Sequence, residues 1–104
     1  MLDESAERLI NEGLWEELRR RCRALGGSPR LPPAVRSRVR DLEEEMSSTD
    51  WSRLGVLLGI LWFKIDRTLD ALGVIAKSTQ NVDRNTALTV SKLDALIQAM
   101  RGAR

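Results

Sequence analysis

The apolar residues of this chain recur at intervals of three or four along most of its length, which is the spacing of one face of a helix. In the first such stretch, acids cluster at the start and arginines at the end, which suits both ends of the helix dipole. Gly26-Gly27 then favours a helix end. We therefore predict a helix from about Asp3 to Leu25. Its apolar positions are Leu2, Ala6, Leu9, Ile10, Leu14, Leu18, Cys22 and Leu25.

A second, shorter helix is predicted after a connector. The run from Gly26 to Pro33 holds two glycines and three prolines, so we expect a loop there. Pro33 fits the first turn of a following helix, where a missing N–H costs nothing. Apolar residues line one side of this helix, which we expect to end near Met46. They are Val35, Val39, Leu42 and Met46.

The polar segment from Ser47 to Asp50 is predicted to separate this helix from the next. Its side chains can accept hydrogen bonds from free backbone N–H groups at a helix start. Ser47 and Asp50 also stand at the spacing of a capping box, with Asp in place of the usual Glu. We therefore expect a new helix to begin near Asp50.

The chain from residue 50 onward forms one long amphipathic pattern, with steps typical of a helix seam that packs against another helix. Its middle is polar between Lys77 and Ser91, which leaves two alternatives open. Either Ser78 to Asn81 forms a turn between two helices of a hairpin, or a single helix of about 50 residues extends for roughly 75 Å. The seam positions are Leu54, Leu58, Leu61, Ile65, Leu69, Leu72, Ile75, Thr79, Val82, Thr86, Thr89, Leu93, Leu96 and Met100.

These elements predict an all-α fold, either a small helical bundle or a helical hairpin with a long, coiled-coil-like C-terminal helix. Hydrophobic residues make up 42% and charged residues 31% of the 104 residues, as in ordinary folded domains. We expect residues 1–46 to form an N-terminal helical segment, with its loop at 26–33. Residues 47–104 would form the long amphipathic part of the same compact domain.

Catalysis is not expected, because the residues that most often perform it are missing. The chain contains no histidine and no tyrosine, which removes the commonest general acid–base group and a frequent metal ligand. The acids Glu43 to Glu45 and Glu16-Glu17 are interpreted as a solvated surface. No Gly-rich phosphate loop is present. We therefore predict that the protein is not an enzyme and has no cofactor or metal site.

The single cysteine and the first residues bear on location. With only Cys22, no intramolecular disulfide can form, which favours a reducing compartment. The chain starts without the basic and apolar segments of a secretory signal. We therefore predict a cytoplasmic protein.

The charges are unevenly distributed, although the net charge is only +2. Residues 19–40 carry eight arginines and no acid, and acidic segments flank them on both sides. These arginines could contact a phosphate backbone. The favoured alternative is that they pair with acids at Glu12, Glu16, Glu17 and 41–45. The candidate phosphate contacts are Arg19, Arg20, Arg21, Arg23, Arg36, Arg38 and Arg40.

Residues 54–63 are ten uncharged residues in a row and form the most hydrophobic window. A membrane-spanning helix needs about 20 apolar residues, so this window does not span a bilayer. It is apolar on all sides of a helix, and more than one partner surface must therefore cover it.

Together these features predict a non-catalytic helical protein–protein interaction module that self-associates, as an adaptor, regulator or assembly subunit. We expect a homo-oligomer and a protein partner that the sequence does not identify. One alternative is a dimeric nucleic-acid-binding protein that uses residues 19–40, and a second is membrane-surface association through 54–63, which is disfavoured. The predicted interface residues are Leu54, Leu58, Leu61, Trp62, Ile65, Leu69, Leu72, Leu93, Leu96 and Met100.

Overall fold

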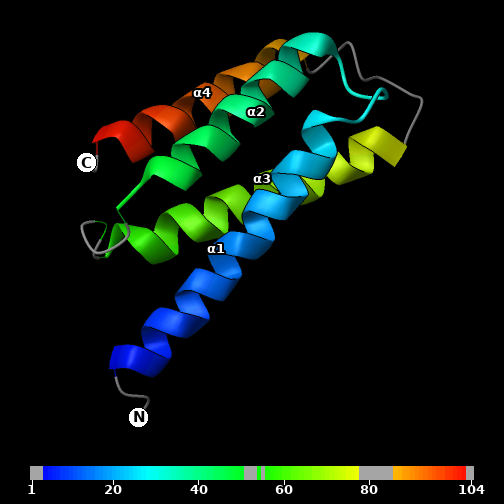
Figure 1. The fold of residues 1–104 in the computed structure, drawn as a ribbon. Coiled ribbons are helices and arrows are strands. Elements are labelled where there is room, and N and C mark those ends of the chain that lie inside the picture. Colours follow the sequence, from blue (N-terminus) through cyan, green and yellow to red (C-terminus); the bar gives the residue numbers. More distant parts are fainter. Residues whose placement is uncertain (1–3, 51–53, 55, 78–85, 103–104) are drawn as a thin grey trace.

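The computed structural model describes residues 4–50, 54, 56–77 and 86–102, with side chains from residue 10 onward. Four helices occupy these ranges: α1 (Glu4–Gly26), α2 (Pro33–Ser48), α3 (Leu57–Lys77) and α4 (Thr86–Gly102). The described residues include no strand. The all-α fold predicted from the hydrophobic spacing is confirmed (Figure 1).

The ends of α1 and α2 follow the glycines and prolines of the connector. The N–H of Gly27 donates to the carbonyl of Arg23 at 3.3 Å, which closes the last turn of α1. Pro33 occupies the first turn of α2, as predicted. A Cβ atom at Gly26 would lie 3.0 Å from Cγ of Arg40. The glycine therefore lets the end of α1 approach α2 closely.

The predicted capping box is wrong, and α3 begins at Leu57 rather than near Asp50. Ser47 and Ser48 belong to α2. The Ser47 hydroxyl donates to the Glu43 carbonyl at 3.0 Å, and the Ser48 hydroxyl donates to the Glu45 carbonyl at 3.3 Å. Hydroxyl side chains can act as donors to the preceding turn as readily as they accept from a following helix. Here they satisfy the last carbonyls of α2.

The C-terminal half contains two helices that pack against each other, α3 and α4. A single continuous helix across this half is therefore not confirmed, and the fold-back alternative describes the structure. The segment Ser78 to Asn81, where the turn was predicted, lies outside the described residues.

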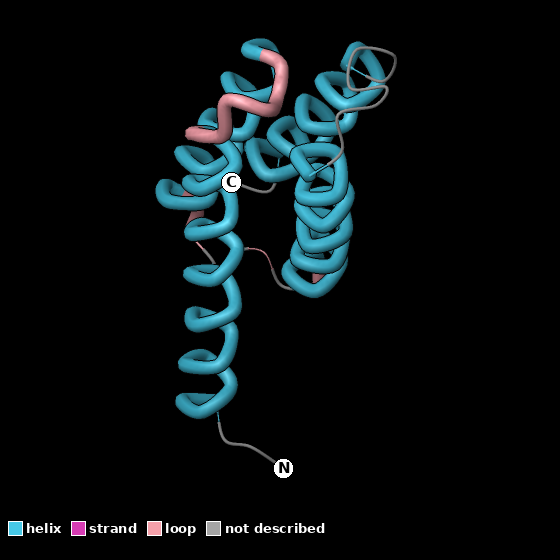
Figure 2. The backbone as a smooth tube through the Cα atoms, turned by 90° about the vertical axis from the view of Figure 1, so that its right-hand side faces the viewer, coloured by secondary structure: helices cyan, strands magenta, loops and turns pink. Residues whose placement is uncertain are grey.

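The four helices form two antiparallel hairpins that lie side by side in the same direction (Figures 1 and 2). Within the first hairpin, Arg23 near the end of α1 pairs with Glu43 of α2. Between the hairpins α1 runs parallel to α3, and α2 runs parallel to α4. Three side-chain pairs join the two hairpins: Arg21 with Asp66, Arg38 with Asp94, and Arg101 with Glu45.

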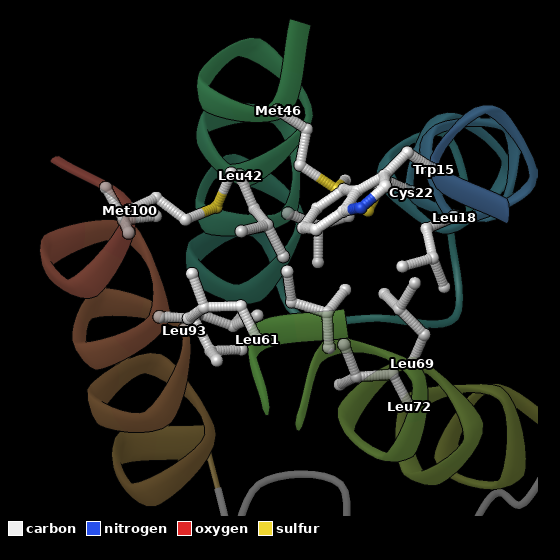
Figure 3. Packing of buried hydrophobic residues seen from close by; sticks show 14 of the residues in the cluster. Trp15, Leu18, Cys22, Leu42, Met46, Leu61, Leu69, Leu72, Leu93 and Met100 are labelled. Carbon is white, nitrogen blue, oxygen red and sulfur yellow. The ribbon is translucent and has the colours of Figure 1, made fainter. Parts of the chain in front are cut away.

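One hydrophobic core occupies the centre of these helices (Figure 3). It includes the sulfur-containing side chains of Cys22, Met46 and Met100, none of which exposes any measurable surface. All four helices contribute to it. Each hairpin therefore needs the other hairpin to cover its apolar side chains. Its remaining members are Trp15, Leu18, Leu31, Val35, Val39, Leu42, Leu54, Leu61, Ile65, Leu69, Leu72, Leu93, Leu96 and Ile97.

The molecule is elongated because α1 is longer than the bundle that it joins. The principal extents are 46 × 24 × 18 Å, and the radius of gyration is 14.2 Å. A compact chain of this length would have a radius of gyration of about 13 Å. The N-terminal part of α1 extends beyond the other helices in both views (Figures 1 and 2). This part of α1 therefore has fewer neighbours than the rest of the bundle.

Candidate functional site

Most of the ten predicted interface residues lie in the hydrophobic core of the single chain. Eight of them are at most 5% exposed and form the core between the helices. Only Leu58 and Trp62 of α3 are partly buried at the edge of this core. A second chain can therefore not reach most of the predicted seam while this fold is intact. The eight buried residues are Leu54, Leu61, Ile65, Leu69, Leu72, Leu93, Leu96 and Met100.

Other apolar side chains remain exposed on α1 and α3. Ile10 and Leu14 of α1 expose 49% and 39% of their surface, and Ile60 and Phe63 of α3 expose 49% and 53%. Ile10 and Leu14 are four residues apart, and Ile60 and Phe63 are three apart, so each pair shares one side of its helix. The sequence analysis placed Ile10 and Leu14 on the apolar stripe of the first helix, and Ile60 and Phe63 in the apolar window 54–63, but it did not predict any of the four as an interface residue.

A groove lies at the contact between α1 and α3. Asn11, Leu14 and Trp15 line it from α1. Its volume is about 300 Å³. Leu58, Gly59 and Trp62 line it from α3.

We call this surface the α1–α3 face, and it comprises the groove together with Ile10, Leu14, Ile60 and Phe63. Gly59 lines the groove, and no atom lies within 4 Å of where its Cβ would be. A side chain at this position would therefore have open space around it.

Trp62 leaves a polar atom without a partner at this face. Its indole Nε1 is buried, and no acceptor among the described residues bonds to it. A buried donor without an acceptor costs on the order of 1–3 kcal/mol. The groove therefore has an apolar lining and one unsatisfied donor beside it.

The α1–α3 face offers contact area rather than reactive groups. Its lining residues include no acid, base or nucleophile. In the described part of the chain, no cluster of three residues of the kind that hold metals occurs. Among the same residues, no helix has the length and apolarity to cross a bilayer. The arrangement suits the packing of another apolar surface.

The arginines of residues 19–40 are largely paired with acids of the same chain. Arg21 on α1 contacts Asp66 at 2.6 Å and Asp70 at 2.5 Å on α3, and it also donates to the Asp66 carbonyl at 3.2 Å. The side chains of Arg21 and Asp66 are each about one quarter exposed, so solvent screens this pair only in part. Arg21 thus fixes the position of α1 along α3.

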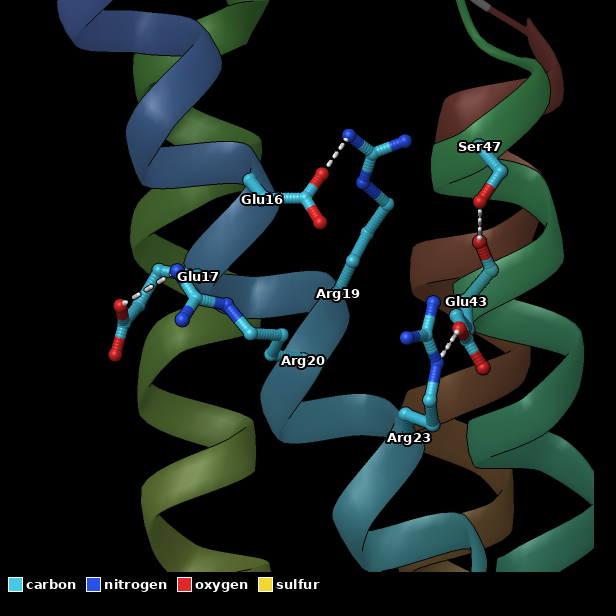
Figure 4. A network of polar contacts seen from close by, with 7 residues as sticks. All are labelled: Glu16, Glu17, Arg19, Arg20, Arg23, Glu43 and Ser47. Atoms are coloured by element: carbon cyan, nitrogen blue, oxygen red, sulfur yellow. Dashed lines mark hydrogen bonds and ion pairs between the residues drawn. The ribbon is translucent and has the colours of Figure 1, made fainter.

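Arg19, Arg20 and Arg23 point toward neighbouring acids (Figure 4). Arg19 pairs with Glu16, and Arg20 approaches Glu17 at 3.7 Å. Arg23 contacts Glu43 of α2 at 3.0 Å. These pairs are exposed on at least one side, and such contacts contribute about 0–1 kcal/mol each.

On α2, Arg38 pairs with Asp41 at 3.3 Å and with Asp94 of α4 at 3.1 Å. Arg36 and Arg40 differ, since no acid among the described residues lies within ion-pair distance of either. The Nε of Arg36 is buried without an acceptor. Five of the seven candidate phosphate contacts are therefore neutralised within the chain, and two are not.

Two further groups have perturbed pKa values. Burial is the main cause that raises the pKa of the Cys22 thiol to about 12, and the charge of Glu43 adds to it. The thiol is therefore neutral in the folded protein. The pKa of Arg101 is raised above its ordinary value, first by its hydrogen bond to Glu45 and then by the charge of that carboxylate. Arg101 Nε lies 2.7 Å from Glu45 Oε1 and compensates the charge of this buried acid.

Comparison of the chain with protein-family models, with curated proteins and with solved structures found no match. The functional argument therefore rests on the side chains and geometry of the α1–α3 face.

Proposed function

We propose that this protein is a non-catalytic helical interaction module that associates with a second copy of itself through the α1–α3 face. The observation that supports this is the exposure of Ile10, Leu14, Ile60 and Phe63, each between 39% and 53%, on the two helices that line the groove. Single exposed apolar residues are common on proteins, but a contiguous group of them marks an interaction surface.

The size of the face fits the centre of an interface. Four half-exposed side chains of this kind leave several hundred Å² of apolar surface in contact with water, on the order of the largest patches on monomeric proteins. A stable complex buries about 800 Å² per partner, of which the apolar centre is only a part. Polar residues around the face would therefore supply the remaining area.

A second copy is the partner that the apolar surface favours. In a two-fold dimer both subunits use the same patch, so the exposed apolar side chains of one copy would cover those of the other. Glu17 lies 3.7 Å from Arg20, so the α1 edge carries both signs of charge, and Lys64 and Arg67 are exposed on α3. The apolar surface therefore supports this proposal, and the charges do not select the partner.

The ion pairs of the arginines weigh against the nucleic-acid alternative. Arg19, Arg20, Arg21, Arg23 and Arg38 each have an acid within 4 Å. Binding to phosphates would replace these acids by phosphate oxygens as partners of the arginines. The loss of the existing ion pairs would reduce the net free energy of binding. Arg36 and Arg40 remain available, but two arginines without aromatic side chains beside them make a small site for nucleic acid.

The first experiment is the absolute mass in solution, measured by light scattering on a sizing column at low and high salt. The ratio of absorbance at 260 and 280 nm across the peak reports bound nucleic acid. We expect a dimer free of nucleic acid that persists at high salt, because its centre is apolar. A monomer at every concentration would contradict the proposal, and a nucleic-acid complex that dissociates in salt would replace it.

A matched pair of variants tests whether the α1–α3 face is responsible. Phe63→Glu places a charge at the centre of the face, and we expect it to weaken dimerisation by at least 100-fold. The control variant, Val74→Glu, also introduces a negative charge on α3, at a residue that is 67% exposed and does not line the groove. We expect this control to remain dimeric. Equal loss in both variants, or in neither, would contradict a role for the face.

A further inference from the structure

One side of α3 carries exposed apolar residues at its start and exposed bases after them. Four residues of this side follow one another at steps of three, four and three, so they form one stripe along the helix. They are Leu57, Ile60, Lys64 and Arg67, and all four are exposed. Val56 directly precedes α3 and is 88% exposed. We call these five residues the outer stripe.

The outer stripe lies away from the groove between α1 and α3. Lys64 is two residues after Trp62, which lines the groove, and two residues correspond to about 200° around a helix. The outer stripe shares Ile60 with the α1–α3 face, whereas its other members do not belong to that face. It is therefore a separate surface, which goes beyond the proposed function.

The two bases of the outer stripe have no acid partner. Among the described residues, no acid lies within ion-pair distance of Lys64 or Arg67. The acids Asp66 and Asp70 of the same helix are both paired with Arg21. The outer stripe therefore presents positive charge that the chain does not compensate.

We infer that the outer stripe binds the surface of an anionic membrane, with its apolar residues among the headgroups and its bases on lipid phosphates. The uncompensated bases favour this partner, because each basic residue near an anionic leaflet adds to the attraction. The sequence analysis disfavoured membrane association through 54–63. The structure adds which residues of that window are exposed and which bases follow them on the same side.

The order of the residues along α3 suits this partner. A helix rises about 1.5 Å per residue, so Lys64 and Arg67 follow Ile60 by about 6 and 10 Å along the axis. Helices at membrane surfaces bury their apolar side to a depth of about 5–10 Å. Long basic side chains also pack their stems on apolar surface while the charge stays in water. Arg67 does so here, with its guanidinium 4.9 Å from the centre of the Phe63 ring.

Sedimentation with vesicles tests the inference on the purified protein. One set of vesicles contains phosphatidylcholine alone, and the other set also contains phosphatidylserine. At low salt we expect about ten times more protein on the anionic set. High salt should reduce this binding, because ions screen the bases. Equal binding to both sets would overturn the inference. Binding to neither set would also overturn it and would leave the bases to an acidic protein.

A pair of neutral double variants assigns the binding to the apolar start of α3. Val56→Ser combined with Leu57→Ser removes two exposed apolar side chains of the outer stripe, and we expect binding to fall about tenfold. The control combines Val74→Ser with Leu88→Ser, at residues that are 67% and 60% exposed outside the stripe. We expect the control to bind as the unchanged protein does. The same loss in both variants would overturn the inference.

A second pair of variants tests the bases without introducing acids. Lys64→Gln combined with Arg67→Gln removes both charges of the outer stripe, and we expect its preference for anionic vesicles to disappear. Lys77→Gln combined with Lys92→Gln removes two exposed charges elsewhere and should keep the preference. Circular dichroism checks that every variant is folded. A preference that both variants keep, or that both lose, would contradict the role of the outer stripe.

The outcomes separate this inference from the proposed function. Because Val56 and Leu57 lie outside the α1–α3 face, light scattering should give their double variant the same mass as the unchanged protein. A dimer that does not bind anionic vesicles overturns the inference alone. A monomer that binds them through the outer stripe overturns the proposed function alone.

Discussion

Helices α2 and α3 have similar positions in the bundle, but α2 exposes mainly polar side chains to water and α3 exposes large apolar ones. Each buries one apolar stripe between two neighbouring helices. The outward side of α2 is polar throughout, with Ser37, Arg40, Glu44 and Ser47 exposed. The outward side of α3 instead exposes Ile60, Phe63 and Val74, beside the charged Lys64, Arg67, Asp70 and Lys77.

The difference shows where the single chain leaves its apolar surface uncovered. In α2, the apolar side is buried within the chain and the polar side faces water. For α3, one chain covers the stripe around Ile65 and Leu69 but leaves a second apolar side in water. A hydrophobic side that the fold does not cover is the expected property of a helix that takes part in association.

The largest expected effect that sharpens this comparison is on thiol labelling. With the pKa of Cys22 raised to about 12 from an ordinary 9.0, its thiolate fraction at pH 8 falls about 1000-fold. We expect iodoacetamide to label Cys22 only in the unfolded chain.

In a Cys22→Ala background, we expect rapid labelling of Ser37→Cys at all concentrations. Labelling of Ile60→Cys should be rapid in dilute protein and slow in the dimer. Equal labelling of the two new cysteines at high concentration would contradict the comparison.

The same thiol gives a dependence of stability on pH. Below pH 9 the thiol is neutral in both the folded and the unfolded state. Between pH 9 and about 12 it ionises only in the unfolded state, because its pKa in the folded protein is raised. The contribution of Cys22 to stability is therefore lost as pH rises through this window. Urea unfolding of the protein and of Cys22→Ala at pH 8, 10 and 11 measures it as a shrinking difference.

The next effect concerns the two apolar sides of α3 itself. Leu69→Ala removes side-chain volume from the core, and we expect it to lower the free energy of unfolding by about 2–5 kcal/mol. Ile60→Ala removes a half-exposed side chain, and we expect a loss below about 1 kcal/mol in dilute protein. Chemical denaturation at low concentration measures both. A similar loss at the two positions would mean that the outward side is already covered within the chain.

A smaller effect separates the two tryptophans of the groove. Trp15 is 1% exposed, so Trp15→Phe leaves a cavity, and we expect a loss of about 1–3 kcal/mol. Trp62→Phe also removes volume, but it removes an indole N–H for which the described part of the chain provides no acceptor. We therefore expect a smaller loss for Trp62, below about 1 kcal/mol, in the same urea titration. A greater loss at Trp62 would show that its N–H is satisfied in solution.

The smallest effects concern the acids that hold α3 beside α1. Asp66→Ala removes a mostly shielded contact with Arg21, and we expect a loss of about 1 kcal/mol. Asp70 is 69% exposed, so we expect Asp70→Ala to cost only a few tenths of this amount. High salt should reduce the difference between the two variants. Thermal unfolding at two salt concentrations provides the measurement.

The sequence predicts the interior of this protein better than its surface. Stripes such as Leu61, Ile65, Leu69 and Leu72 are recognised because the fold needs one apolar side per helix, and spacing alone locates it. The same spacing did not separate the side of a helix that packs within its own chain from a side that stays exposed. The predicted interface was therefore mostly core.

The sequence located the apolar window 54–63 of the candidate site but not which of its residues are exposed. In the window 54–63 all sides of the helix are apolar, so periodicity does not distinguish Leu61, which is buried, from Ile60, which is exposed. That distinction depends on where α1 and α4 pack, which is a tertiary property. The pairing of the arginines was anticipated more closely, because opposite charges in adjacent segments attract. The partners of Arg21 are Asp66 and Asp70, which lie 45 and 49 residues away in the sequence.

The parallel placement of the two hairpins has a consequence for the order of folding. Contacts within a hairpin join residues that are near in sequence and close quickly, whereas contacts between hairpins close long loops and form late. The pairs Arg21–Asp66, Arg38–Asp94 and Arg101–Glu45 all belong to the late set. Removing one of them should accelerate unfolding while leaving the rate of refolding nearly unchanged. These ion pairs would thus act mainly on the lifetime of the folded state.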